Sequence, residues 1–156
     1  MAAKRCDQIQ VHLTCRVPDK KELDWALEYL DVESKQDLSL DPDFSGAIIA
    51  WLVLPTGAER PIAIYGIDRD EGKYGSFAWM MTTQYLQYYK AHRLMIRTIR
   101  KVLGDEIASR AYVWGTCRKS SPIVSVLNLI GAEFKVRDEE TNFWVLSVNH
   151  KLWRTL

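Results

Sequence analysis

Hydrophobic and polar residues alternate over residues 8–17, and this pattern predicts a half-buried strand with Ile9, Val11, Leu13, Cys15 and Val17 on one face. The spacing then becomes helical. Asp19 and Glu22 match a capping box and predict a helix that ends near Leu30. Residues 31–45 are polar and rich in Asp, so we expect a surface excursion with at most a short helix near residues 34–38.

Apolar runs bounded by turn residues predict three strands next, at residues 46–54, 61–67 and 74–81. After Thr83 the apolar residues recur at spacings of three and four, which predicts one helix over residues 83–103, with Gly104 and Asp105 ending it. The remaining pattern predicts a strand, a helix and two strands, at residues 110–115, 120–130, 133–136 and 142–148.

This order of elements predicts an α/β (α+β) fold with a mixed, mostly antiparallel sheet of about seven strands and helices on both faces. The chain has 156 residues, 47% of them hydrophobic, and six Trp, which suits a single domain over residues 1–156. A net charge of +1 provides no global field that would recruit nucleic acid or a membrane. Three cysteines without a Cys-x-x-Cys pair indicate a reducing compartment.

No apolar run reaches the length of about 18 residues that a membrane span needs. The first residues also lack the apolar segment of a secretory signal. We therefore expect a soluble, intracellular protein that is not secreted and does not enter a membrane.

The order of elements resembles the GNAT N-acetyltransferase fold, and residues 126–134 are similar to its fourth helix running into its sixth strand. Residues 77–83, the arginine-bearing helix after them and residues 120–134 resemble a GNAT-like family of short-tailed bacteriophages. That family includes internal virion protein A and phage proteins labelled as acetyltransferases. The resemblance implies other phage virion proteins as partners, and a place in the host cytoplasm during infection or in the virion interior.

The resemblance also implies an acetyl-CoA site where the third of these strands meets the long helix, at Met81, Thr82, Thr83, Gln84 and Tyr85. The enzymes of the family place two small residues there, usually glycines, because a small residue lets backbone N–H groups close on a pyrophosphate. Here no glycine occurs between Ser76 and Leu103. We therefore expect the phosphate cradle to be lost and the protein to use no cofactor.

Catalysis of acetyl transfer needs a base for the amine proton and an acid for the leaving thiolate. The family commonly places a Tyr four residues before the glycine that ends its fourth helix, and Leu127 occupies this position here. Residues 74–81 offer no carboxylate. We assign no catalytic residue, although Tyr112 or Tyr85 could substitute geometrically.

The long helix carries basic residues with no compensating Asp or Glu, namely Lys90, Arg93, Arg97, Arg100 and Lys101. This basic stripe is either a nucleic-acid contact or a solvated helix face. His12, His92 and His150 lie far apart in the sequence, so we expect no metal site. Arg118 and Lys119 favour a lowered pKa for Cys117, but no histidine base is identifiable for it.

Residues 149–156 form a tail in which Trp153 either contacts a partner or packs back onto the sheet. Three functional hypotheses follow. The favoured one is a catalytically degenerate GNAT-like phage protein, virion-associated or structural, that acts through protein contacts. The others are an active acetyl-CoA-dependent N-acetyltransferase with an atypical pyrophosphate loop, and a module that binds a host protein or nucleic acid.

Overall fold

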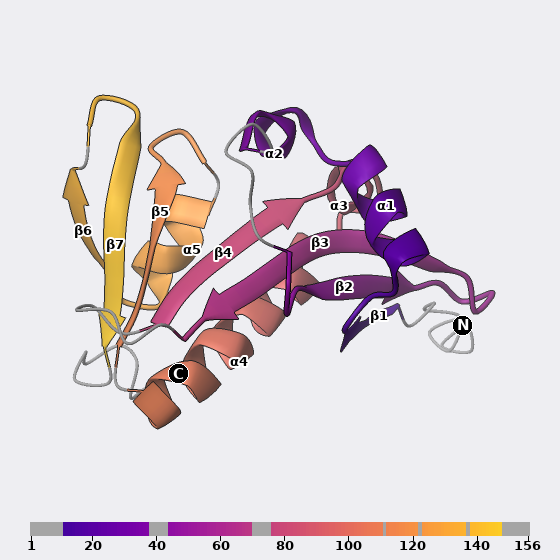
Figure 1. Ribbon diagram of the computed structural model, residues 1–156, viewed down its shortest axis with the longest axis horizontal. Coiled ribbons are helices and arrows are strands. Elements are labelled where there is room, and N and C mark those ends of the chain that lie inside the picture. The colour runs from indigo at the N-terminus through magenta and orange to yellow at the C-terminus, as the bar shows by residue number, and fades with distance from the viewer. Residues whose placement is uncertain are drawn as a thin grey trace, which may run out of the picture. The chain divides into compact units, whose positions relative to one another are not determined.

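The structure of the protein is a computed structural model that describes residues 11–37, 44–69, 76–110, 112–121, 123–136 and 138–147 (Figure 1). Its helices are α1 (Lys20–Glu28), α2 (Val32–Asp37), α3 (Gln84–Tyr88), α4 (His92–Arg110) and α5 (Ile123–Leu129). Its strands are β1 (His12–Arg16), β2 (Ile48–Val53), β3 (Glu59–Asp68), β4 (Ser76–Thr82), β5 (Tyr112–Arg118), β6 (Glu133–Val136) and β7 (Thr141–Ser147).

The described strands form one seven-stranded sheet in the order β1-β2-β3-β4-β5-β7-β6. β1 with β2, β2 with β3, β5 with β7 and β6 with β7 are antiparallel, whereas β4 and β5 are parallel. Between the described residues of these two strands, the parallel pairing covers two residue pairs, Ser76 with Val113 and Phe77 with Trp114. The predicted mixed, mostly antiparallel sheet is therefore confirmed.

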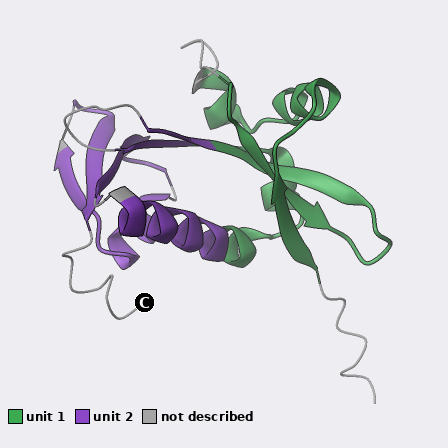
Figure 2. Ribbon diagram, turned by 60° about the horizontal axis from the view of Figure 1, so that its bottom comes forward, with its two compact units in different colours: residues 1–65, 80–95 green, residues 66–79, 96–156 purple. Residues whose placement is uncertain are grey.

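The chain divides into two compact units, one of residues 1–65 and 80–95 and the other of residues 66–79 and 96–156 (Figure 2). The prediction of a single domain stays a prediction.

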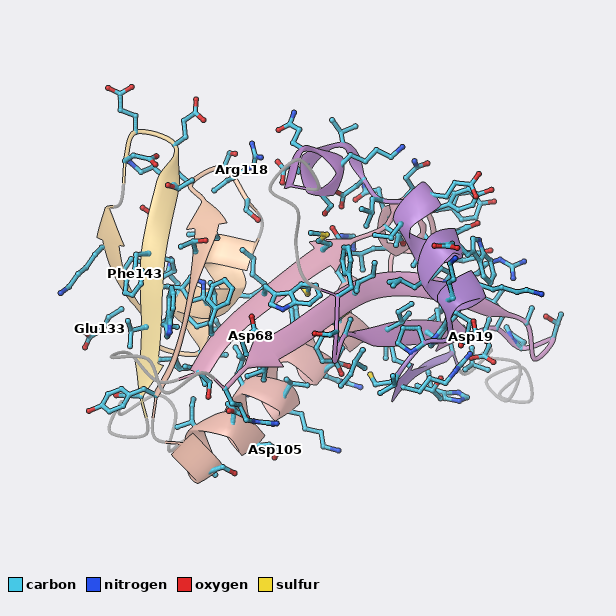
Figure 3. The ribbon with its side chains drawn as sticks, viewed as in Figure 1. Asp19, Asp68, Asp105, Arg118, Glu133 and Phe143 are labelled. Atoms are coloured by element: carbon cyan, nitrogen blue, oxygen red, sulfur yellow. The ribbon has the colours of Figure 1, made fainter. Side chains whose placement is uncertain are left out.

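In the first unit, α1 crosses the strands β2 and β3 (Figure 1). The predicted capping box is confirmed, because the Glu22 N–H donates to Asp19 Oδ1 (2.8 Å) and the Asp19 N–H donates to Glu22 Oε1 (3.1 Å). Asp19 lies at the start of the helix (Figure 3). Trp25 of α1 packs against Trp51 of β2 with ring centroids 5.6 Å apart, and this contact seats the helix on the sheet.

In the second unit, buried residues of α4, β5, β7, α5 and the turn that follows α5 form the core: Leu103, Ile107, Val113, Leu127, Ile130, Trp144 and Leu146. Glu106 of α4 is 3% exposed and accepts hydrogen bonds from Arg69 and from Ser76 Oγ. A buried carboxylate needs such partners to remain charged, and the same ion pair raises the pKa of Arg69.

The prediction of one helix over residues 83–103 was right at its start but wrong in its interior and at its C-terminal end. α3 ends at Tyr88 and α4 begins at His92, because Lys90 adopts φ 52°, in the left-handed region, and turns the chain. α4 also continues through Gly104 to Arg110. Leu103 and Ile107 are both buried one turn apart, and this burial outweighs the cost of about 1 kcal/mol for glycine within a helix.

Two further expectations change. The strand predicted at residues 110–115 is β5 at Tyr112–Arg118. On the strand predicted at residues 8–17, the face expected to be buried is largely open, since Val11, Cys15 and Val17 are exposed, whereas Ile9 lies outside the described residues. Arg16 on the other face bonds to Glu22 and Glu59. β1 is an edge strand, and its position explains the partial burial of both faces.

Candidate functional site

The junction between β4 and α3 holds the residues that the resemblance assigns to acetyl-CoA. Four consecutive backbone N–H groups of this junction each donate to an acceptor of the same chain. The bonds run from Thr82 to Ser34 Oγ (3.0 Å), from Thr83 to the Ile62 carbonyl (2.9 Å), from Gln84 to the Tyr29 carbonyl (2.8 Å) and from Tyr85 to Thr83 Oγ1 (3.3 Å). None of these four groups is left for a phosphate oxygen.

The segment that connects α1 to α2 supplies much of this pairing. Leu30 forms an antiparallel bridge with Thr83, and the Asp31 N–H donates to the Thr82 carbonyl (3.0 Å). The Asp31 carboxylate accepts a hydrogen bond from Thr82 Oγ1 and another from the Ser34 N–H (2.8 Å). Residues from about fifty positions earlier in the chain therefore occupy the end of β4.

Thr83 is the N-cap of α3 and is 1% exposed. Its hydroxyl donates to the Pro61 carbonyl (2.5 Å) and accepts from the Tyr85 N–H. α3 has only five residues, so its dipole is small compared with that of a long helix. The junction is thus fitted to hold β3, β4 and α3 together, and as it stands it does not fit a pyrophosphate.

The N-terminus of α4 differs from the junction. The Ala91 carbonyl accepts the first helical bond, from Met95 (3.0 Å), and the N–H groups of His92 and Arg93 have no acceptor among the described residues. Lys90, His92 and Arg93 are exposed, and the first turn contains no acidic residue. Cations at a helix N-terminus oppose the dipole by about 0.3–1 kcal/mol each, so a bound anion would be favourable here.

The residues considered for acid–base chemistry belong to two different compact units. Leu127, at the position of the family's tyrosine, is 1% exposed in the core of the second unit. Tyr112, at the start of β5 in that unit, is 49% exposed. Tyr85 belongs to the first unit and packs against Tyr29, whose pKa it raises through charge repulsion. The described part of β4 carries no carboxylate or imidazole.

Cys117 packs against the core of the second unit. Burial raises the pKa of its thiol, so the lowering expected from Arg118 and Lys119 was wrong. The described residues contain no group of three or more His, Cys, Asp or Glu side chains that could hold a metal ion. His150 lies outside the described residues, and so do Trp153 and the whole of the tail at 149–156.

The basic stripe lies on α4 and on the turn before it. Lys90, Arg93, Arg97 and Lys101 are exposed and Arg100 is partly exposed. None of the five forms an ion pair with a described residue. None of the helices in this part of the chain combines the length and apolarity that a membrane crossing requires.

A group of tyrosines was missed by the sequence reasoning. Tyr85, Tyr88 and Tyr89 matched the apolar face of the predicted long helix, but the chain turns at Lys90 and leaves Tyr88 75% exposed. The turn has neither glycine nor proline, so no local signal marked it. We call Tyr29, Tyr85, Tyr88 and Tyr89 the tyrosine cluster.

No protein-family model matches the chain, and no curated protein sequence matches it. Solved structures do. A GNAT-family acetyltransferase from Bacillus anthracis aligns with a TM-score of 0.60 at 11% identity, over 89% of this chain and 97% of its own. The ribosomal-protein-S18-alanine N-acetyltransferase of Escherichia coli gives 0.57 at 10% identity, over 87% and 94%.

The yncA protein of Salmonella typhimurium, solved with its cofactor acetyl-CoA, gives a TM-score of 0.54 at 10% identity, over 88% of this chain and 94% of its own. At these identities the similarity establishes the fold alone. The chain has the fold of GNAT acetyltransferases, as the resemblance implied.

Proposed function

We propose that the chain is a catalytically degenerate protein with the GNAT fold, which acts through contacts with other proteins. The resemblance to a phage family suggests that these contacts are made during virion assembly or inside the particle. The observation that carries the proposal is the pairing of the four N–H groups of Thr82–Tyr85 within the chain.

Acetyl transfer would need a bound cofactor, a base and an acid in one place. The β4–α3 junction offers no free N–H group between residues 82 and 85, β4 offers no base, and the family's acid position is the buried Leu127. Each of these departures would weaken transfer, and together they support a binding role.

The basic stripe is the surface that we propose for a partner. Its cations have no ion-pair partner among the described residues, so they are available to an acidic surface. Trp153 of the tail remains a predicted contact residue beyond the described part of the chain.

Calorimetric titration with acetyl-CoA tests the proposal. We expect no heat of binding up to millimolar ligand, measured against injection into buffer. A micromolar isotherm with one site per chain would contradict the proposal. Thermal unfolding of the same sample confirms that the protein is folded during the titration.

One observation favours a second candidate, an acetyl-CoA-dependent acetyltransferase with an atypical phosphate site. At the N-terminus of α4, the N–H groups of His92 and Arg93 have no acceptor in the described part of the chain, and three exposed basic side chains lie beside them in the sequence. If this end of α4 held the cofactor phosphates, Lys90→Ala and Arg93→Ala would each abolish the isotherm. Lys101→Ala, which removes a charge from the same helix two turns further on, would leave it unchanged.

A further inference from the structure

The tyrosine cluster forms a connected row of rings on the first unit. Tyr29 and Tyr85 have ring centroids 5.1 Å apart, Tyr85 and Tyr89 stack at 6.2 Å, and Tyr88 meets Tyr89 edge-on at 4.8 Å. Tyr29 is 36% exposed and Tyr88 is 75% exposed. The row therefore begins and ends with a ring open to solvent.

Two basic residues follow this row closely in the chain, and a third lies beside Trp25, a neighbour of the row. Lys90 follows Tyr89 directly and Arg93 lies in the first turn of α4. Trp25 lies 6.4 Å from Tyr85, and the Arg60 guanidinium stands 6.0 Å from the Trp25 ring. Tyr85 and, after it, the carboxylate of Glu28, which precedes Tyr29 in the chain, raise the pKa of Tyr29.

Exposed aromatic rings close in the chain to cations that form no ion pair with a described residue match the chemistry of a single-stranded nucleic acid. Bases stack on aromatic rings whatever their sequence, and phosphates pair with the cations between the stacking positions. An acidic peptide would satisfy Lys90 and Arg93 but would leave the exposed face of Tyr88 without a partner. A duplex would contact the cations but keep its bases stacked within itself.

We propose that the tyrosine cluster, with Lys90 and Arg93, binds single-stranded nucleic acid without sequence preference. Tyr88 and Tyr29 stack on bases, and Lys90, Arg93 and the N-terminus of α4 hold the phosphates. This inference does not rest on the absence of catalysis, because DNA binding and acetyl-CoA binding are measured separately on the same protein.

Fluorescence anisotropy with a labelled oligothymidylate of about 20 nucleotides tests the site at low salt, with the full chain. We expect Tyr88→Ala to weaken binding about fivefold or more, the range seen when one stacking aromatic is removed. Tyr88→Phe keeps the ring and should bind like the wild type. Tyr112→Ala is the matched control, because it removes a half-exposed tyrosine from outside the cluster.

The charges are tested by salt. Affinity should fall as salt rises, and Lys90→Ala should reduce the slope of log affinity against log salt by about 0.7, the value for one phosphate contact on a single strand. Because Tyr88 and Lys90 are both exposed, these variants should fold, and circular dichroism verifies that they do.

Three results would overturn the inference. One is the absence of any binding at low salt. Another is wild-type affinity in Tyr88→Ala combined with a loss in Arg97→Ala and Lys101→Ala, which would assign the phosphates to the later part of the basic stripe, without stacking on the tyrosine cluster. The third is displacement of the oligonucleotide by polyglutamate or by a duplex of equal length at equal concentration.

Discussion

Replacing Thr83 with valine removes one hydroxyl from the β4–α3 junction while keeping the shape of the side chain. In the native protein that hydroxyl donates to the buried Pro61 carbonyl (2.5 Å) and caps α3 by accepting from the Tyr85 N–H (3.3 Å). Thr83 is 1% exposed, so water cannot replace these partners without a rearrangement. A buried carbonyl left unpaired costs about 1–3 kcal/mol and a lost cap about 1 kcal/mol.

We therefore expect Thr83→Val to lower the free energy of unfolding by about 2–3 kcal/mol. Urea denaturation followed by tryptophan fluorescence measures this change. With a slope of about 2 kcal/mol per molar urea, the midpoint should fall by about 1 M or more.

Thr83→Ser is the matched control, because it keeps the hydroxyl and removes only a methyl group. It should lose less stability than Thr83→Val. A loss below about 0.5 kcal/mol in Thr83→Val, the range of an ordinary surface substitution, would refute the reasoning that the junction is held by its own hydrogen bonds.

Three other substitutions or modifications are predicted from the structure. Gly115→Ala should lower the free energy of unfolding by about 1–3 kcal/mol in urea denaturation, because a Cβ there would lie 2.6 Å from the Trp144 ring and 2.8 Å from a backbone oxygen. Cys117 should be alkylated by iodoacetamide more slowly than the exposed Cys15, because burial raises the pKa of the Cys117 thiol, and peptide mass spectrometry measures both rates. Since the pKa of this thiol is higher in the folded than in the unfolded protein, the free energy of unfolding should also fall as pH rises above about 9. Lys90→Gly should raise the midpoint of urea denaturation by the equivalent of about 0.5–1 kcal/mol, because glycine adopts φ 52° without strain.

Each has its own control. The nearest atoms to a Cβ at Gly66 all belong to the side chain of Trp79, which can move, so Gly66→Ala should lose less stability than Gly115→Ala. A larger loss in Gly66→Ala than in Gly115→Ala would contradict the packing described. Equal alkylation rates at Cys117 and Cys15 would contradict the burial of the thiol. Lys90→Ala removes the same charge as Lys90→Gly but keeps the backbone strain. An equal gain in stability in both variants would show that the effect comes from the lost charge and not from the relief of strain.

The fold was predictable where local pattern and burial agree. The capping box at Asp19 and the order of strands followed from periodicity and turn residues. The break before α4 did not, because a lysine in the left-handed region leaves no mark in the sequence. The end of α4 was misplaced because Gly104 is a local signal, whereas the burial of Ile107 depends on the core that it joins.

The candidate site was also predictable only in part. The sequence itself shows that residues 81–85 contain no glycine, and this absence predicted the loss of the phosphate cradle. The groups that pair with this junction, such as the Tyr29 carbonyl and Ser34 Oγ, come from about fifty residues earlier, and no local pattern predicts such contacts. The tyrosine cluster likewise depends on two segments distant in the chain, which meet only in the folded unit.

The most direct measurement follows the backbone amides by heteronuclear NMR while acetyl-CoA is added to the labelled protein. With the N–H groups of Thr82–Tyr85 bonded within the chain, their signals, and those of His92 and Arg93, should not move at millimolar acetyl-CoA. Saturating shifts of Thr82–Tyr85 would mean that the junction opens for the cofactor, and saturating shifts of His92 and Arg93 would place the phosphates on α4. Either result would contradict a catalytically degenerate protein and favour the acetyltransferase.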